Sequence, residues 1–232
     1  MFILSSHKQQ ILSNFWITCK IVFYAGLYNH LLGIQRKKMA VHKYPSFVQH
    51  PVAILLSRKY TGSRLKLVVN FNRGGDRLVV ILKNPSKATK NCSDHTINNV
   101  LNFVYAKLPN IGCVIIYNLF IPYQTNSKQL IGIANKVGYV NLTGGALVNR
   151  LLLCDLKKSS ISIVAWGAHP NYLSKEYRKR ILEVIDIINI SGHDKKVHYV
   201  EKISKKGYPL HAQVWSSKYD LHRAKFRSYE VI

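Results

Sequence analysis

The chain has 232 residues and a formal net charge of +24 at pH 7, from 34 Lys and Arg against 10 Asp and Glu. A hydrophobic fraction of 47% is enough for a folded core and excludes wholesale disorder. The charge favours a polyanionic partner, most often nucleic acid; an anionic membrane surface, or a proteome that is basic throughout, are the alternatives.

The few acidic residues and the cysteines exclude several classes of enzyme. No two acidic residues fall as a pair in the loops after the predicted strands, which disfavours two-carboxylate hydrolases and metal-dependent nucleases. The four cysteines form no C-x-x-C pair, so we expect free thiols in a reducing cytosol and no metal site. The dinucleotide-binding, Walker and GxSxG motifs do not occur, and we expect no cofactor.

The first 38 residues differ from the rest of the chain. Polar residues interrupt the apolar stretch 11–33, which makes it a marginal candidate for a membrane span. Met39 follows a basic run, so residues 1–38 are consistent with an over-extended start; an amphipathic helix is the alternative. We therefore expect an N-terminal extension over residues 1–38 and one α/β domain over residues 39–232.

From residue 64 on, short apolar runs rich in β-branched residues alternate with helical periodicity. Two strands at 64–71 and 77–82, joined by a glycine-containing turn, predict a β-hairpin. The elements expected next are a helix at 94–107, a strand at 111–117, a helix at 145–156 with Leu147, Leu151 and Leu152 on one face, a strand at 161–165, a helix at 171–188 and a strand at 197–203. This order predicts an α/β fold, a three-layer sandwich with a central, mostly parallel sheet between helices.

Each predicted strand leads into a short polar signature. Parallel strands present their carboxyl ends at one edge of a sheet, where ligands bind, so the signatures are expected to meet there. They are Lys83-Asn84-Pro85-Ser86, Asn118-Leu119-Phe120, Trp166-Gly167 and, after a basic loop, Tyr208-Pro209-Leu210-His211.

Three of these residues carry useful chemistry. Pro85 biases Asn84 away from helix, so the Asn84 amide could position a water or read a ligand, although an Asx-turn is the alternative. Asn118 offers one acceptor and two donors, which suit the edge of a pyrimidine or adenine, or it caps a turn. His211 can donate to a developing oxyanion, or it is a surface histidine.

Basic and apolar residues near the signatures suit DNA. The lysines expected to hold a DNA strand by charge are Lys83, Lys87, Lys90, Lys205 and Lys206. Val214 and Trp215 could form a wedge that enters a base stack, or they could belong to the core.

Together the signatures LKNPS, YNLF, AWG and GYPLH, in this order and spacing, resemble the uracil-DNA glycosylase superfamily. The resemblance is closest to its mismatch-specific thymine/uracil branch, whose first motif carries Asn-Pro in place of Asp-Pro. The chain also looks like a bacterial group labelled only as a domain of unknown function, which occurs on mobile elements such as staphylococcal cassettes. The resemblance covers about residues 64–222. It implies a glycosylase-like α/β fold and a monofunctional DNA glycosylase: a cytoplasmic, monomeric repair hydrolase that flips uracil out of DNA without metal or cofactor.

The resemblance also implies roles for individual residues. Asn84, within the Asn84-Pro85-Ser86 motif, would position water, Asn118 would read the uracil edge, and His211 would stabilise the departing uracil anion. Val214 and Trp215 fall near the position of a leucine that fills the hole left by the flipped nucleotide. The usual His-Pro-Ser is His211-Ala212-Gln213 here, which leaves loop rigidity and a phosphate contact open.

Three further residues are candidates with alternatives. His95 and Phe103 are candidates for the ring that stacks on the base. Asp94 could supply the charge that Asn84 lacks, or it could simply be the N-cap of the helix.

Without an aspartate in the first motif, the protein could instead be a module that binds DNA or a damaged base. A third hypothesis is a decoy that binds a proteinaceous glycosylase inhibitor or a repair partner. Base preference and the choice between single and double strands stay open.

Overall fold

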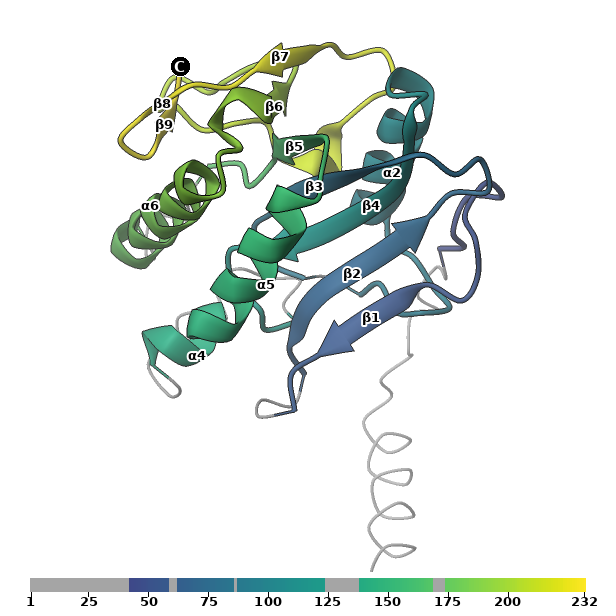
Figure 1. Ribbon diagram of the computed structural model, residues 1–232, viewed down its shortest axis with the longest axis horizontal. Helices are drawn as coiled ribbons and strands as arrows, with labels where there is room; N and C mark the ends of the chain where they lie inside the picture. Colours follow the sequence, from purple (N-terminus) through teal and green to yellow (C-terminus); the bar gives the residue numbers. More distant parts are fainter. Residues whose placement is uncertain (1–41, 59–61, 86, 124–137, 169–173) are drawn as a thin grey trace, which may run out of the picture. The chain divides into compact units, whose positions relative to one another are not determined.

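In the computed structural model (Figure 1), the described residues are 42–58, 62–85, 87–123, 138–168 and 174–232. They include a sheet of seven strands in the order β1-β2-β4-β3-β5-β6-β7. The strands are β1 (Ala53–Leu56), β2 (Arg64–Asn70), β3 (Asp76–Leu82), β4 (Ile111–Asn118), β5 (Ile161–Val164), β6 (Val197–Val200) and β7 (Leu221–Arg223). The four central strands, β4, β3, β5 and β6, are parallel, and the outer strands pair antiparallel.

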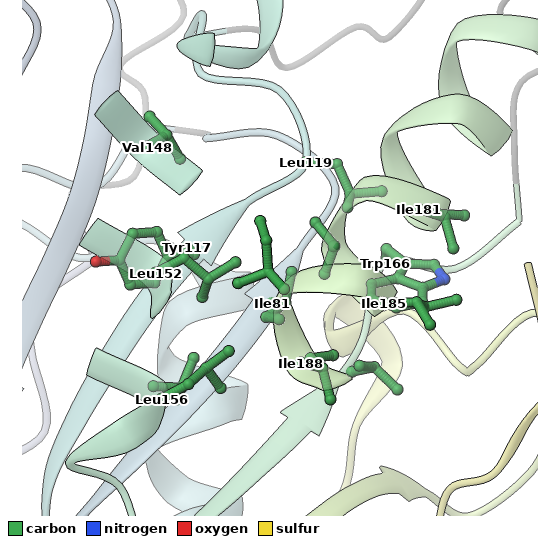
Figure 2. Packing of buried hydrophobic residues seen from close by; sticks show 14 of the residues in the cluster. Ile81, Tyr117, Leu119, Val148, Leu152, Leu156, Trp166, Ile181, Ile185 and Ile188 are labelled. Carbon is green, nitrogen blue, oxygen red and sulfur yellow. The ribbon is translucent and has the colours of Figure 1, made fainter. Parts of the chain in front are cut away.

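Helices cover both faces of this sheet (Figure 1). They are α2 (His95–Lys107), α4 (Tyr139–Thr143), α5 (Gly145–Lys157) and α6 (Ser174–Ile190). Along β4, Ile115 and Tyr117 pack into the cluster that contains α5 and α6, whereas Val114 and Ile116 pack into the cluster that contains α2. Figure 2 shows the first cluster, with Trp166 among residues of α6. The prediction of an α/β fold with a central, mostly parallel sheet is confirmed.

The predicted β-hairpin is wrong, because β4 lies between β2 and β3. The connection between these two strands passes closely over the start of β4, where a side chain on Gly112 would lie 1.9 Å from the backbone of Gly74. β3 pairs in parallel with β4, which it reaches through α2, and does not pair with β2 across the local turn. Every residue of β4 is buried, so this strand takes a central place in the sheet.

The helices begin and end close to their predicted limits. Asp94 is the N-cap of α2, as expected, and its side chain accepts a hydrogen bond from the Ile97 amide at 2.9 Å. The predicted leucine face of α5 is wrong at one position: Leu147 is 57% exposed, while Val148 and Leu156 are buried beside Leu152.

A second small sheet at the C-terminus braces the loop that leads to His211. The hairpin of β8 (Phe226–Arg227) and β9 (Glu230–Val231) lies against this loop. The Val231 amide donates to the Gly207 carbonyl oxygen at 2.8 Å. The ring of Tyr229 stacks on Tyr208, with ring centroids 6.2 Å apart.

The predicted boundary at residue 38 and the apolar stretch 11–33 lie outside the described residues. Within the described ranges, no helix combines the length and the apolar character needed to cross a membrane.

Candidate functional site

The carboxyl ends of β3 and β5 form a topological switch point. These strands are neighbours in the sheet, yet the chain leaves β3 towards α2 on one face and leaves β5 towards α6 on the other. Ligands of open α/β sheets bind at such points. We call Lys83, Asn84, Asn118, Gly167 and His211 the carboxyl-edge cluster, since each lies at this end of the sheet or contacts a residue there.

Asn118 ends β4, directly opposite Leu82 of β3. Its side chain lies on the same face of the sheet as Ile116, because side chains alternate along a strand. The residue is only 2% exposed, and neither Nδ2 nor Oδ1 makes a hydrogen bond within the described residues. Buried amides normally have partners, since an unpaired one costs about 1–3 kcal/mol. The buried, unpaired amide of Asn118 at the switch point is therefore a candidate group for binding a ligand.

Asn84 lies one strand away from Asn118 and is half-buried. Hydrogen bonds continue the pairing of β3 with β4 past the strand ends, from the Phe120 amide to the Lys83 carbonyl oxygen at 3.0 Å. The Asn84 amide nitrogen lies 3.4 Å from the Pro85 carbonyl oxygen, a long contact. Pro85 is buried, which fixes the turn, and Ser86 lies outside the described residues.

Lys83 is half-buried, and its side chain spans the switch point. Its Nζ donates to the Ala168 carbonyl oxygen at 2.7 Å and lies 5.8 Å from the centre of the Tyr177 ring. The Tyr177 hydroxyl in turn lies 2.8 Å from the carbonyl oxygens of Trp166 and Gly167. Burial lowers the pKa of Lys83 to about 8. Lys83 is therefore a half-buried member of the site, and its contact with a DNA strand stays a prediction.

His211 packs against Gly167 through its side chain. Its Nδ1 accepts a hydrogen bond from the Gln213 amide at 3.1 Å, so the neutral ring carries its proton on Nε2. Burial, with a smaller contribution from the Lys83 charge, lowers the pKa of His211 to about 4. At neutral pH the ring is therefore an uncharged donor through Nε2–H.

Asp94 has a structural position. One carboxylate oxygen caps α2. The other accepts a hydrogen bond from the Ala88 amide at 3.1 Å, which connects the loop after β3 to the helix. Arg64, buried beneath the same loop, donates to the Ala88 carbonyl oxygen at 3.2 Å, and the Tyr44 hydroxyl donates to Thr89 at 2.7 Å. Both Asp94 oxygens are bonded to backbone amides, which favours the N-cap interpretation over the catalytic one.

Of the two residues predicted to form a wedge, only Val214 is accessible. Val214 is 55% exposed at the end of the 3₁₀ turn Ala212–Val214 (η3), whereas Trp215 is 5% exposed. The Trp215 ring packs on Phe103 with centroids 5.1 Å apart, and its Nε1 donates to the Leu210 carbonyl oxygen. The wedge prediction is therefore wrong for Trp215, and the stacking prediction is wrong for the fully buried Phe103.

The remaining predicted contacts lie on the surface. His95 is exposed at the first turn of α2, where its Nε2 lies 3.3 Å from the Asn99 amide nitrogen. Asn99 also donates to the Gln213 carbonyl oxygen at 2.7 Å, which joins α2 to η3. The other lysines predicted to bind DNA are exposed: Lys87, Lys90, Lys205 and Lys206.

Sequence reasoning missed the contact of Gly167 with His211 and the half-buried position of Lys83 against Ala168. A glycine just after a buried strand was the available signal for Gly167. No signal was available for Lys83, because burial of a lysine depends on tertiary packing.

In the part of the chain that the structure describes, no group of three His, Cys, Asp or Glu side chains could hold a metal ion. A cavity of about 580 Å³ lies elsewhere, between the C-terminal half of α6 and β7, and is lined by Asp186, Asp194 and Arg223 among others.

Comparison with known protein families gives a match over most of the described domain. Residues 64–212 match a family described as "Protein of unknown function (DUF1643)". This range runs from the start of β2 to the residue after His211 and contains all four strand-end signatures. No curated protein and no solved structure matches the chain.

Proposed function

The chain belongs to the DUF1643 family, and we propose that it is a DNA glycosylase that hydrolyses the N-glycosidic bond of a flipped uracil. The observation that carries the proposal is the buried, unpaired Asn118 amide at the switch point. An amide presents one donor and one acceptor side by side, which complements the adjacent carbonyl and N–H on the edge of uracil. A base can reach such a group only after it leaves the DNA stack.

The neutral His211 supports the same chemistry. When the glycosidic bond breaks, the base departs as an anion with charge on a carbonyl oxygen. A preorganised Nε2–H can stabilise this charge without transferring a proton, and the lowered pKa of His211 keeps the ring in this uncharged form. Asn84 cannot accept a proton, so its role is to orient the attacking water.

The charge of the protein fits a DNA substrate. Exposed Lys87 and Lys90 lie on the loop after β3, and exposed Lys205 and Lys206 lie on the loop before His211, so both loops of the site are basic. These lysines would hold the phosphates on either side of the flipped nucleotide. The exposed Val214 would fill the gap in the stack, a role suited to a small apolar side chain on a turn.

A second candidate function is a binding module that grips a damaged base without cleaving it. One observation favours this alternative: Asp94, the acid expected to supply the charge that Asn84 lacks, has both carboxylate oxygens bonded to backbone amides. Activation of water would then depend on Asn84 alone.

An alkali-cleavage assay on a uracil-containing oligonucleotide separates these two functions. We expect alkali-labile sites with the native protein, and about 100-fold fewer with Asn84→Ala or His211→Ala. Asn189→Ala and His222→Ala, which change the same residue types outside the carboxyl-edge cluster, serve as controls. Tight binding of the oligonucleotide without any alkali-labile site would establish the binding module and overturn the glycosylase proposal.

Salt dependence tests the role of the basic loops. If the four exposed lysines neutralise phosphates, the association constant should fall by about two orders of magnitude between 50 and 200 mM salt. Fluorescence anisotropy with labelled DNA would measure this, and a flat profile would show that the basic surface serves another purpose.

A further inference from the structure

Lys83 has no task in the proposed hydrolysis, although it lies within the carboxyl-edge cluster. It precedes Asn84 in the chain, and its charge acts on His211. Its Nζ donates to the carbonyl oxygen of Ala168, which follows β5, so the side chain spans the switch point between β3 and β5. The ion pairs formed by the described residues do not include Lys83, so no carboxylate fixes it in the charged state.

We propose that Lys83 is a nucleophile that attacks the aldehyde of an abasic site, which gives the protein a DNA lyase activity in addition to base removal. This inference rests on the proposed function, because an abasic site is the product that a glycosylase leaves at this position. It replaces the expectation of a monofunctional enzyme.

The surroundings of Lys83 suit a nucleophilic amine. An amine attacks only when unprotonated, and lysines that form Schiff bases are activated by desolvation. With a pKa of about 8, about a quarter of Lys83 is neutral at pH 7.5, against about 0.1% for an ordinary lysine. The hydrogen bond to Ala168 uses an N–H of the amine and leaves the nitrogen lone pair available.

The proposed reaction balances without any redox partner. The Lys83 nitrogen bonds to C1′ of the open-chain sugar, and the carbonyl electron pair moves to oxygen. After protonation this oxygen leaves as water, which gives a protonated imine. The imine acidifies C2′, whose proton passes to solvent; the released electron pair forms the C2′–C3′ double bond, and the 3′-phosphate departs with the electrons of the C3′–O bond. Water then hydrolyses the imine, which restores Lys83 and leaves an unsaturated aldehyde on the DNA.

Borohydride trapping on a duplex with a preformed abasic site tests the proposal directly. Borohydride reduces the imine to a stable amine, so the protein becomes covalently attached to the DNA. We expect native protein to form this adduct, and peptide mass spectrometry to place it on Lys83. Lys83→Arg, which keeps the charge but removes the nucleophile, should lower the yield at least about 10-fold. Lys158→Arg, an exposed lysine at the end of α5, is the matched control.

Several results would overturn the proposal: no adduct with native protein, an undiminished yield with Lys83→Arg, or an adduct mapped to Lys205 or Lys206. Mapping on native protein keeps the test valid even if Lys83→Arg folds poorly. A tetrahydrofuran abasic analogue, which has no aldehyde, must give no adduct. Because the abasic site is preformed, trapping at Lys83 without uracil release would refute only the glycosylase proposal. Uracil release without trapping would refute only the lyase.

Discussion

The side chain of His211 rests directly on Gly167, so closely that a methyl group on Gly167 would lie 2.8 Å from Cβ of His211. Gly167 has a φ of +67°, a conformation that residues with side chains rarely adopt. The backbone of Gly167, which carries no side chain, therefore lets His211 pack directly against it and fixes the position of the imidazole.

Replacing Gly167 with alanine should displace His211. We expect uracil release to fall by about 10- to 100-fold, because a small misplacement of a catalytic group is costly. The positive φ should also lower the free energy of unfolding by about 1 kcal/mol. Gly192→Ala is the matched control, because Gly192 has a φ of +71° but no neighbouring atom within 4 Å of the added methyl. Equal activities of the two variants, measured beside urea unfolding, would contradict a role for this contact.

Asn118→Leu should separate stability from activity. Leucine has a similar volume and removes a buried amide that has no partner among the described residues, so the free energy of unfolding should rise by about 1 kcal/mol. Uracil release should be lost, because leucine cannot bond the base. Ser162→Ala, which removes another buried and unpaired polar group in β5, should stabilise without affecting release. A fully active Asn118→Leu variant would rule out base recognition by this residue.

The pKa of His211 should be visible in its titration. Its ring proton resonances should stay constant from pH 8 to about 5.5 and move only near pH 4. Because this pKa lies below the ordinary 6.5, the unfolded chain binds the proton more readily. The contribution of His211 to stability is then complete above pH 6.5 and is lost as the pH falls towards 4. His211→Gln should lack this part of the pH dependence of unfolding, and an identical dependence in both proteins would refute the low pKa.

Val214 and Trp215 should respond in opposite ways to truncation. Val214→Ala should weaken base removal from duplex DNA while changing the free energy of unfolding by less than about 0.5 kcal/mol, since the side chain is exposed. Trp215→Ala should cost about 3–5 kcal/mol, because the ring packs on Phe103 within the core. Denaturant unfolding and activity on duplex and single-stranded substrates would measure both effects. Equal losses of stability would show that Val214 is also a packing residue.

The strand-end signatures could be located from the sequence because each follows a run that is apolar enough to be buried. The helices were predictable for a similar reason, as with Asp94 before α2, where cap and periodicity agree. The pairing of β2 with β3 was not, because the turn at Gly74 and Gly75 has the composition of a hairpin turn. The place of β4 between them depends on contacts distant in the sequence.

Individual site residues were less predictable than the sheet. Lysine is usually exposed, so the half-buried position of Lys83 beside Tyr177 and Ala168 could not be predicted from the sequence. Trp215 and Val214 are adjacent and both apolar, yet the turn η3 directs one into the core and the other to solvent. Such differences arise from tertiary structure and cannot be predicted from the neighbouring residues in the sequence.

The C-terminal hairpin has a practical consequence for work on this protein. The matched family region ends at residue 212, so a chain trimmed to it would retain Asn84, Asn118 and His211. It would nevertheless lose the Val231 bond to Gly207 and the Tyr229 ring beside Tyr208. The segment before His211 would then gain conformational freedom, and the entropy of ordering it would oppose every productive encounter with substrate. An inactive trimmed protein would therefore not show that Asn84, Asn118 and His211 lack a catalytic role.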